Sequence, residues 1–169
     1  SPENKPLGYK SAITANASMD IAAAKDIIAM YIDMENELQN EGYKERIKKA
    51  EKLNNELPDY QYDESGAIRE WAMKEYQENN AHRHISHLYC AWPAYQTQHN
   101  NKLANACRQA ILNRNKENSR KDDTASHGWI HKALVEARLK NSEEVYNILN
   151  MLVHSDIFYS TLFTDHNTN

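Results

Sequence analysis

Glycine and proline are scarce in this chain, and their scarcity argues against a fold built from tight turns. The 169 residues include four glycines and four prolines, about 5% of the chain against roughly 12% in average proteins. Hairpins and tight turns depend on these residues for their special backbone angles. We therefore expect α-helices to be the main element of the fold.

Long hydrophobic runs and an excess of positive charge are also absent. No stretch approaches the roughly 20 consecutive apolar residues of a membrane span, and no basic start followed by an apolar segment marks a signal peptide. The formal net charge is −4. A generic nucleic-acid binder or a polybasic membrane-binding surface needs a concentrated positive face, so we expect neither nucleic acid nor a membrane as a partner.

Cysteines and apolar residues are few as well. The two cysteines, Cys90 and Cys107, are fewer than a disulfide-framed domain normally carries, so we expect free thiols. Hydrophobic residues make up 40% of the chain, and the mean hydropathy is −0.88. This apolar supply is thin for a core that must stand by itself.

Apolar residues recur at helical spacing in five stretches, which predict five helices. The first spans about 19 to 39, with Ser18 as a candidate N-cap before it. The second runs from Ile47 to Leu57 and stops at Pro58, because proline disfavours helical backbone in the preceding residue. The other three have apolar stripes at 103–111, 130–137 and 145–152.

The predicted helices are joined alternately by short and long loops. Asn141 lies three residues before Glu144, the spacing of a capping box at a helix start, so the last two helices should form a tight antiparallel pair. Longer loops are expected at 59–66 and 116–126. No repeat of fixed period supports a regular solenoid, and the pattern favours part of an α/α barrel.

The densest group of reactive side chains is His-Arg-His-Ile-Ser-His-Leu-Tyr at residues 82–89. Imidazole, guanidinium, hydroxyl and aromatic groups together favour a polar substrate-binding strip. Zinc is an alternative because imidazole is a common zinc ligand, but the His-Glu-x-x-His spacing is absent. An incidental histidine cluster is a third interpretation. We expect a binding strip, with no metal and no cofactor.

Several short motifs accompany this strip. They are Ser-Pro-Glu-Asn at 1–4, Ser-Met-Asp at 18–20, Ile-Arg-Glu-Trp at 68–71, Gly-Trp at 128–129 and Ala-Arg-Leu at 137–139. With the specific string His-Arg-His-Ile-Ser-His-Leu, and in this order, they resemble the catalytic domain of glycoside hydrolase family 95, which comprises α-L-fucosidases and some α-L-galactosidases. The resemblance extends over nearly the whole chain.

The resemblance implies an all-α fold, an (α/α)6 barrel of six helical hairpins. It also implies hydrolysis of terminal α-linked fucose with inversion, often of the α-1,2 linkage in oligosaccharides or glycans, by a secreted or periplasmic parent enzyme. Glu3 corresponds to the general acid, which must be protonated when the substrate arrives. Without its motif, Glu3 would be interpreted as an ordinary loop carboxylate.

The resemblance further implies sugar contacts. Arg83 and His84 match residues that contact the sugar, and we place His87 with them as a substrate-binding residue. Trp71 and Trp129 are candidates to stack against the apolar side of a deoxy sugar. Packing between helices is an equally good interpretation of both tryptophans.

Two further matches come without an assigned duty. Asp20 and Glu70 are similar to family positions, and Asp20 is placed where a carboxylate favours a helix N-terminus. His127 differs from the small or hydroxylated residue that usually precedes Gly128 in the family. That departure leaves the sugar preference open.

The catalytic base has no match. An inverting glycosidase needs a second carboxylate roughly 6.5–9.5 Å from the acid, and the family's Gln-Ile-Asp-Gly-Asn-Phe-like segment is missing. Asp165 is not assigned this role. We therefore expect residues 1–169 to be a partial catalytic domain, truncated at both ends, inactive alone and partnered by the rest of the parent domain.

Two other functions stay open at this point. One is an α-L-galactosidase of the same family. In L-galactose C6 bears a hydroxyl, whereas in L-fucose C6 is a methyl group. The other is a non-catalytic helical remnant that binds carbohydrate or another protein, for which the missing base is the main argument.

Overall fold

The structure of the chain is a computed structural model that describes residues 4–117 and 126–154. Within these ranges it contains five α-helices, one short 3-10 helix and no β-strand. In order they are α1 (Ser18–Leu38), α2 (Tyr43–Glu56), η1 (Ser86–Cys90), α3 (Asn101–Glu117), α4 (Ser126–Arg138) and α5 (Ser142–His154). The all-α class is confirmed, and all five predicted helices are present.

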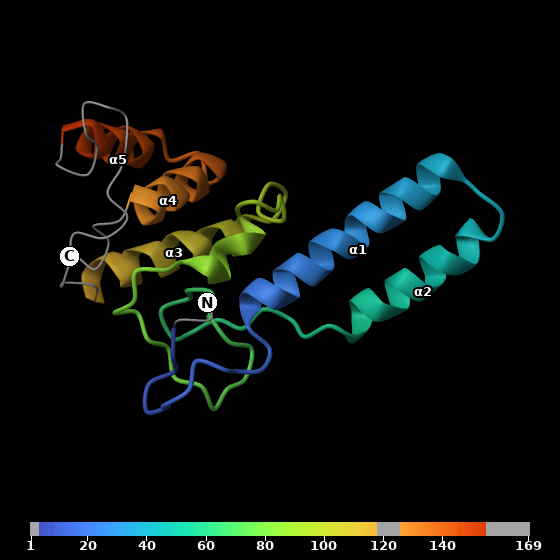
Figure 1. Ribbon diagram of the computed structural model, residues 1–169, viewed down its shortest axis with the longest axis horizontal. Helices are drawn as coiled ribbons and strands as arrows, with labels where there is room; N and C mark the ends of the chain where they lie inside the picture. The colour runs from blue at the N-terminus through green and yellow to red at the C-terminus, as the bar shows by residue number, and fades with distance from the viewer. Residues whose placement is uncertain (1–3, 118–125, 155–169) are drawn as a thin grey trace.

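Two helical hairpins lie at opposite ends of the molecule (Figure 1). α1 and α2 run side by side and project from one end, whereas α4 and α5 form a shorter pair near α3 at the other end. The antiparallel pair predicted for the last two helices is confirmed. The loop segments before α1 and between α2 and η1 gather below α3 and beside the start of α1 in this view.

The start of α1 differs from the prediction. Ala17, not Ser18, is the N-cap, and no side chain caps the helix. The Ser18 hydroxyl instead donates to the Arg69 carbonyl at 2.5 Å, and its backbone N–H donates to the Glu70 carbonyl at 2.9 Å. Ser18 therefore attaches α1 to the segment around residue 70. Asp20 lies in the first turn of α1, as expected.

A bidentate ion pair between Arg46 and Glu35 joins α1 and α2. The Nε and Nη2 atoms of Arg46 donate to the two carboxylate oxygens of Glu35 at 2.6 and 2.7 Å. The turn between the helices uses left-handed backbone at Gln39 and Gly42, with φ of 47° and 76°. Because a guanidinium fork matches a carboxylate in two bonds, this pair fixes the relative position of the helices.

The predicted capping box at the start of α5 is half formed. The Glu144 backbone N–H donates to Asn141 Oδ1 at 3.4 Å. The Asn141 N–H donates to the Glu136 carbonyl at 3.0 Å, so it is not available to the Glu144 side chain. That side chain instead pairs with Lys132 at 3.3 Å, and the reciprocal half of the box is missing.

The main core lies between η1, α3 and the loop before η1. The predicted stripe of α3 is buried at every position, and it comprises Leu103, Ala106, Cys107, Ala110 and Ile111. Cys90 of η1 and Cys107 are free thiols, with their sulfur atoms 3.6 Å apart, against about 2.05 Å in a disulfide. A second, smaller cluster joins α4 and α5.

One face of the α1–α2 hairpin is apolar and uncovered by the described residues. Ile27, Met30, Met34 and Leu38 of α1 and Leu53 of α2 are each more than half exposed. The four α1 residues recur at helical spacing and so share one face. A groove of about 360 Å³ lies between the two helices, and Ile27 and Leu53 are among the residues that line it. No described helix has the length and apolar character needed to cross a membrane.

Candidate functional site

The His-Arg-His strip packs against the start of α4. The His82 and His84 rings meet edge to face at 4.9 Å, and His84 lies 5.9 Å from the ring of His127. Further along α4, His131 lies 5.3 Å from Trp92. The fold therefore gathers imidazoles that are more than 40 residues apart in sequence.

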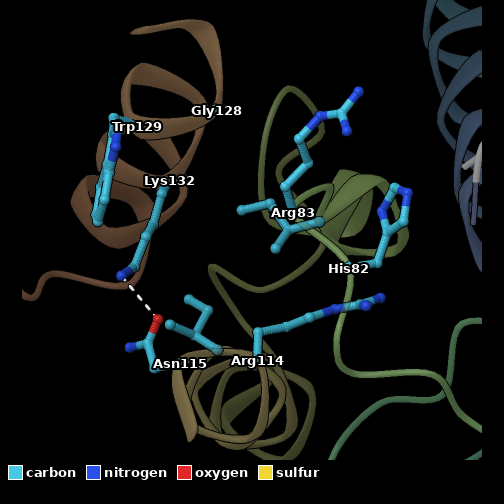
Figure 2. A pocket seen from close by; sticks show the side chains of 9 residues that line it. His82, Arg83, Arg114, Asn115, Gly128, Trp129 and Lys132 are labelled. Atoms are coloured by element: carbon cyan, nitrogen blue, oxygen red, sulfur yellow. Dashed lines mark hydrogen bonds between the residues drawn. The ribbon is translucent and has the colours of Figure 1, made fainter. Parts of the chain in front are cut away.

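A pocket lies where the strip, α3 and α4 meet (Figure 2). The strip contributes His82 and Arg83, α3 contributes Arg114 and Asn115, and α4 contributes Gly128, Trp129 and Lys132. Two of the family-like motifs, His-Arg-His and Gly-Trp, thus line the same pocket. The cavity itself is about 20 Å³, roughly enough for one water molecule, so these residues form a wall and do not enclose a sugar.

The cations around this pocket have protein partners. Lys132 donates to Asn115 Oδ1 at 2.9 Å and lies 5.2 Å from the centre of the Trp129 ring. Figure 2 shows Arg114 extending from α3 toward the loop of His82, whereas the Arg83 guanidinium points away from Arg114. Trp129 is therefore oriented by a cation–π contact that also fixes Lys132.

Burial keeps three of the nearby imidazoles neutral at pH 7. Burial and the neighbouring His84 lower the pKa of His82 to about 4. Burial and the Arg114 guanidinium lower the pKa of His87 to about 3. The pKa of His131 is lowered by the same kind of burial, with His84 as a further cause. A neutral imidazole both donates and accepts, which suits hydroxyl groups.

The predicted site residues do not all share one environment. Arg83 and Trp129 line the pocket, and His84 lies beside it against His127. His87 is 2% exposed, and its Nδ1 atom has no hydrogen-bond partner among the described residues. His87 is therefore enclosed by the protein and does not line the pocket.

Trp71 is a core residue in this structure. Its side chain is fully buried, its Nε1 donates to Thr14 Oγ1 at 2.9 Å, and its ring packs edge-on against Tyr76 at 6.0 Å. The indole offers no surface to a sugar here. Of the two interpretations of Trp71, packing accounts for every contact that we observe.

Glu3 and Asp165 lie outside the described residues. Asn4, the residue after Glu3, is described and is held by buried hydrogen bonds. Asn4 is fully buried, and its Nδ2 atom donates to the Glu70 carboxylate and to the Asn79 carbonyl at 3.2 Å. Arg114 donates to the same two acceptors. We call Asn4, Glu70, Asn79 and Arg114 the Glu70 cluster.

Sequence reasoning missed most of this cluster. The sequence assigns no role to Glu70, and it gives Asn4 only as the last residue of the Ser-Pro-Glu-Asn motif. The available signal was Arg114, which follows Ile111 by three residues and so extends the buried stripe of α3 with a charge. A cation in an apolar stripe predicts a buried partner.

Metal binding finds no support in the geometry of residues 4–117 and 126–154. In these ranges no group of three or more His, Cys, Asp or Glu side chains is arranged to hold a metal ion. The His82 and His84 rings meet edge to face, and His84 contacts His127 of α4 in the same way.

Comparison with known proteins identifies a family and a relative with a similar sequence. The model of the glycosyl hydrolase family 95 catalytic domain matches residues 1–168. A protein of Arabidopsis thaliana named Alpha-L-fucosidase 2 is 29% identical over 183 residues, and the match covers 98% of this chain. The chain spans 21% of that relative's length. The all-helical structure is consistent with a piece of an (α/α)6 barrel. Since the family match runs through every motif that lines the pocket and the Glu70 cluster, the chain belongs to glycosyl hydrolase family 95.

Proposed function

We propose that these residues form part of a glycoside hydrolase that removes terminal α-L-fucose from oligosaccharides or glycans. The observation that carries the proposal is the meeting of the His-Arg-His strip with Gly128 and Trp129 at one pocket. Arg83 and His84 would orient sugar hydroxyls through hydrogen bonds, and Trp129 would face the apolar side of the ring.

The proposed reaction inverts the anomeric centre. Glu3 donates its proton to the glycosidic oxygen as the bond from C1 to that oxygen breaks. Water attacks C1 from the opposite face, and a second carboxylate takes its proton. The base is not assigned to any of these 169 residues. The products are an alcohol from the aglycone and the β-anomer of the free sugar.

Fucose is preferred over galactose in this proposal because of the surface that the pocket offers. Fucose has a methyl group at C5 where galactose has a hydroxymethyl group, and the Trp129 ring supplies apolar area beside the strip. The printed name of the Arabidopsis relative points to the same sugar. The α-1,2 linkage is proposed as the first one to test.

The test uses the whole protein that contains these residues. An α-1,2-fucosylated oligosaccharide is supplied, and proton NMR follows the anomer that forms first. We expect prompt β-anomer, with the rate reduced at least about 100-fold in Glu3→Gln, since general acid catalysis contributes roughly 10²- to 10⁴-fold. Retained activity in Glu3→Gln contradicts the role of Glu3. Galactoside hydrolysis without fucoside hydrolysis favours the α-L-galactosidase, and inactivity on both favours the binding remnant.

A further inference from the structure

We infer that Glu70 is a positioning residue for catalysis and that it fixes the segment carrying Glu3 by holding Asn4. This inference rests on the proposed role of Glu3 as the general acid. It assigns a duty to a buried carboxylate and to the asparagine of the Ser-Pro-Glu-Asn motif. Neither residue is placed in contact with the substrate.

The Glu70 cluster is a closed ring of hydrogen bonds. The Glu70 carboxylate accepts from Asn4 Nδ2 and from Arg114 Nη2. The Asn79 carbonyl accepts from Asn4 Nδ2 at 3.2 Å and from Arg114 Nη1. Each acceptor therefore shares the same two donors, and Asn4 cannot move without breaking bonds to both.

Burial makes this ring a stiff attachment. Asn4 and Glu70 are fully buried, and Arg114 is 4% exposed. A buried polar group that loses its partner costs about 1–3 kcal/mol, and more when it is charged. Burial opposes ionisation of Glu70, but His87, which is charged only in strong acid, and the permanently charged Arg114 outweigh it and lower the pKa of Glu70 to about 2. At neutral pH the charge that holds Glu70 ionised is the Arg114 guanidinium. The carboxylate is thus a charged acceptor throughout the neutral pH range.

The attachment reaches Glu3 through a single peptide bond. Adjacent Cα atoms are about 3.8 Å apart, so holding Asn4 limits where the residue before it can lie. The next residues are held as well. Asn79 Nδ2 donates to the Lys5 carbonyl at 3.1 Å, and the Leu7 N–H donates to the Gln77 carbonyl at 3.1 Å.

The same bonds join the segment that follows Glu3 to the segment that leads into the sugar-binding strip. Residues 77–79, which hold residues 4–7, lead directly into His82, Arg83 and His84. Catalysis depends on the relative position of these two segments, because a misplacement of a reacting group by about 1 Å costs on the order of 100-fold in rate. A buried ion pair contributes little net stability, so stability alone does not explain the Glu70–Arg114 pair. The pair lies where the segment of Asn4 meets the segment that leads into the strip.

Leaving-group dependence tests the inference in the whole protein. Two α-L-fucosides are compared, one with 4-nitrophenol as leaving group and one with a sugar alcohol. The phenol needs little protonation, whereas the alcohol depends on the acid. We expect Glu70→Gln and Asn4→Ala to lower kcat about 10- to 100-fold on the alcohol substrate and less than about threefold on the phenol substrate, with KM nearly constant.

A double variant separates positioning from an independent effect. If Glu70 acts through Glu3, the variant carrying Glu3→Gln and Glu70→Gln loses no more kcat on the alcohol substrate than Glu3→Gln alone. Asn4→Ala keeps the Glu70–Arg114 ion pair. It therefore carries the test if Glu70→Gln, which leaves a buried arginine unpaired, does not fold.

Glu136→Gln is the matched control. Glu136 is 3% exposed and accepts from Asn141 Nδ2 at 2.9 Å, so it is also a buried carboxylate bonded to an asparagine, but in α4. We expect this variant to affect both substrates equally.

Two results would overturn the inference, and they are distinguishable. Equal losses on both substrates in Glu70→Gln and Asn4→Ala, or additive losses in the double variant, overturn the positioning role alone. Absence of leaving-group dependence in Glu3→Gln itself overturns the proposed general acid and the inference with it.

Discussion

Two tryptophans assigned the same role from the sequence occupy different environments. Trp71 is fully buried and bonded to Thr14, whereas Trp129 lines the pocket beside Lys132. Hydrophobicity alone could not separate them, since an indole suits both a core and a sugar-binding surface. The difference arises from which segments the fold brings against each ring.

At the residue scale we predict that substitution of Trp71 lowers stability, whereas substitution of Trp129 weakens substrate binding. Trp71→Phe removes the bond to Thr14 and should lower the free energy of unfolding by about 1–2 kcal/mol, with KM for a fucoside unchanged. Trp129→Ala should raise KM several-fold with a smaller loss of stability. Urea denaturation and initial-rate kinetics measure the two effects. A raised KM in Trp71→Phe would place Trp71 at the sugar instead.

Single residues also show where sequence reasoning reached its limit. Ser18 has the chemistry of an N-cap, yet its hydroxyl donates to the Arg69 carbonyl, a partner 51 residues away. Asn4 gives no local sign of the partners that bury it. Local spacing predicts local bonds, whereas bonds across the fold depend on topology that one sequence does not reveal.

At the scale of elements, α4 ends in a Schellman motif. Its left-handed position is occupied by Lys140, whose side chain makes that backbone conformation strained. Lys140 has φ of 61°, its N–H donates to the Ala137 carbonyl at 3.1 Å, and the Asn141 N–H donates to the Glu136 carbonyl at 3.0 Å. This pattern ends a helix with one left-handed residue, a position that glycine adopts without strain.

We therefore predict that Lys140→Gly raises the free energy of unfolding by up to about 1 kcal/mol. The Lys140 side chain is exposed, so little packing is lost. Lys140→Ala is the matched control, because it removes the side chain and keeps the strain. Thermal unfolding followed by circular dichroism measures both variants, and equal melting temperatures for the two would contradict the prediction.

Helices were the part of the fold that sequence predicted best. The stripe on α3 and the stop at Pro58 reflect local periodicity and local sterics. The short helix η1 was missed because its five residues are too few to show a period. Its residues were singled out for their chemistry, and the structure shows Leu88 and Cys90 in the core as well.

At the scale of the whole molecule, the uncovered face of the α1–α2 hairpin bears on activity. Residues such as Ile27, Met34 and Leu53 are more than half exposed, more apolar surface than a self-contained domain usually leaves on one hairpin. The described helices also form two separate hairpins and do not close a ring. The low hydrophobic content of the sequence predicts an incomplete core. It does not predict that the exposed apolar face lies on the α1–α2 hairpin.

We predict that residues 1–169, expressed alone, release no fucose and bind a hydrophobic dye such as ANS. The reasons are the exposed hairpin face and the lack of an assigned catalytic base. The protein that contains these residues is the positive control, assayed on the same fucosylated oligosaccharide. Fucose release by the 169 residues alone would show that they hold a base as well as an acid.

Buried neutral histidines should make the whole fold sensitive to mild acid. The pKa of His82 is about 4 and that of His87 about 3 in the folded protein, against about 6.5 in an unfolded chain. Below pH 6.5 the unfolded chain therefore binds more protons than the folded one, and stability falls as the pH falls. Glu70 adds to the loss only below about pH 4.5, as the pH approaches its folded pKa of about 2.

Each such histidine costs up to about 1.4 kcal/mol per pH unit once the pH is well below 6.5, so we predict that His82 and His87 together remove on the order of 3 kcal/mol of stability between pH 7 and 5. That is a large share of the roughly 5–15 kcal/mol of a typical domain. Urea denaturation at pH 7 and pH 5 measures the loss. His87→Leu removes one of the two titrating groups and should halve the difference, whereas His154→Gln, at an exposed position on α5, should leave it unchanged. Equal stability at both pH values would mean that neither imidazole is held neutral by burial, and the hydrogen-bonding role proposed for the strip would then need charged imidazoles.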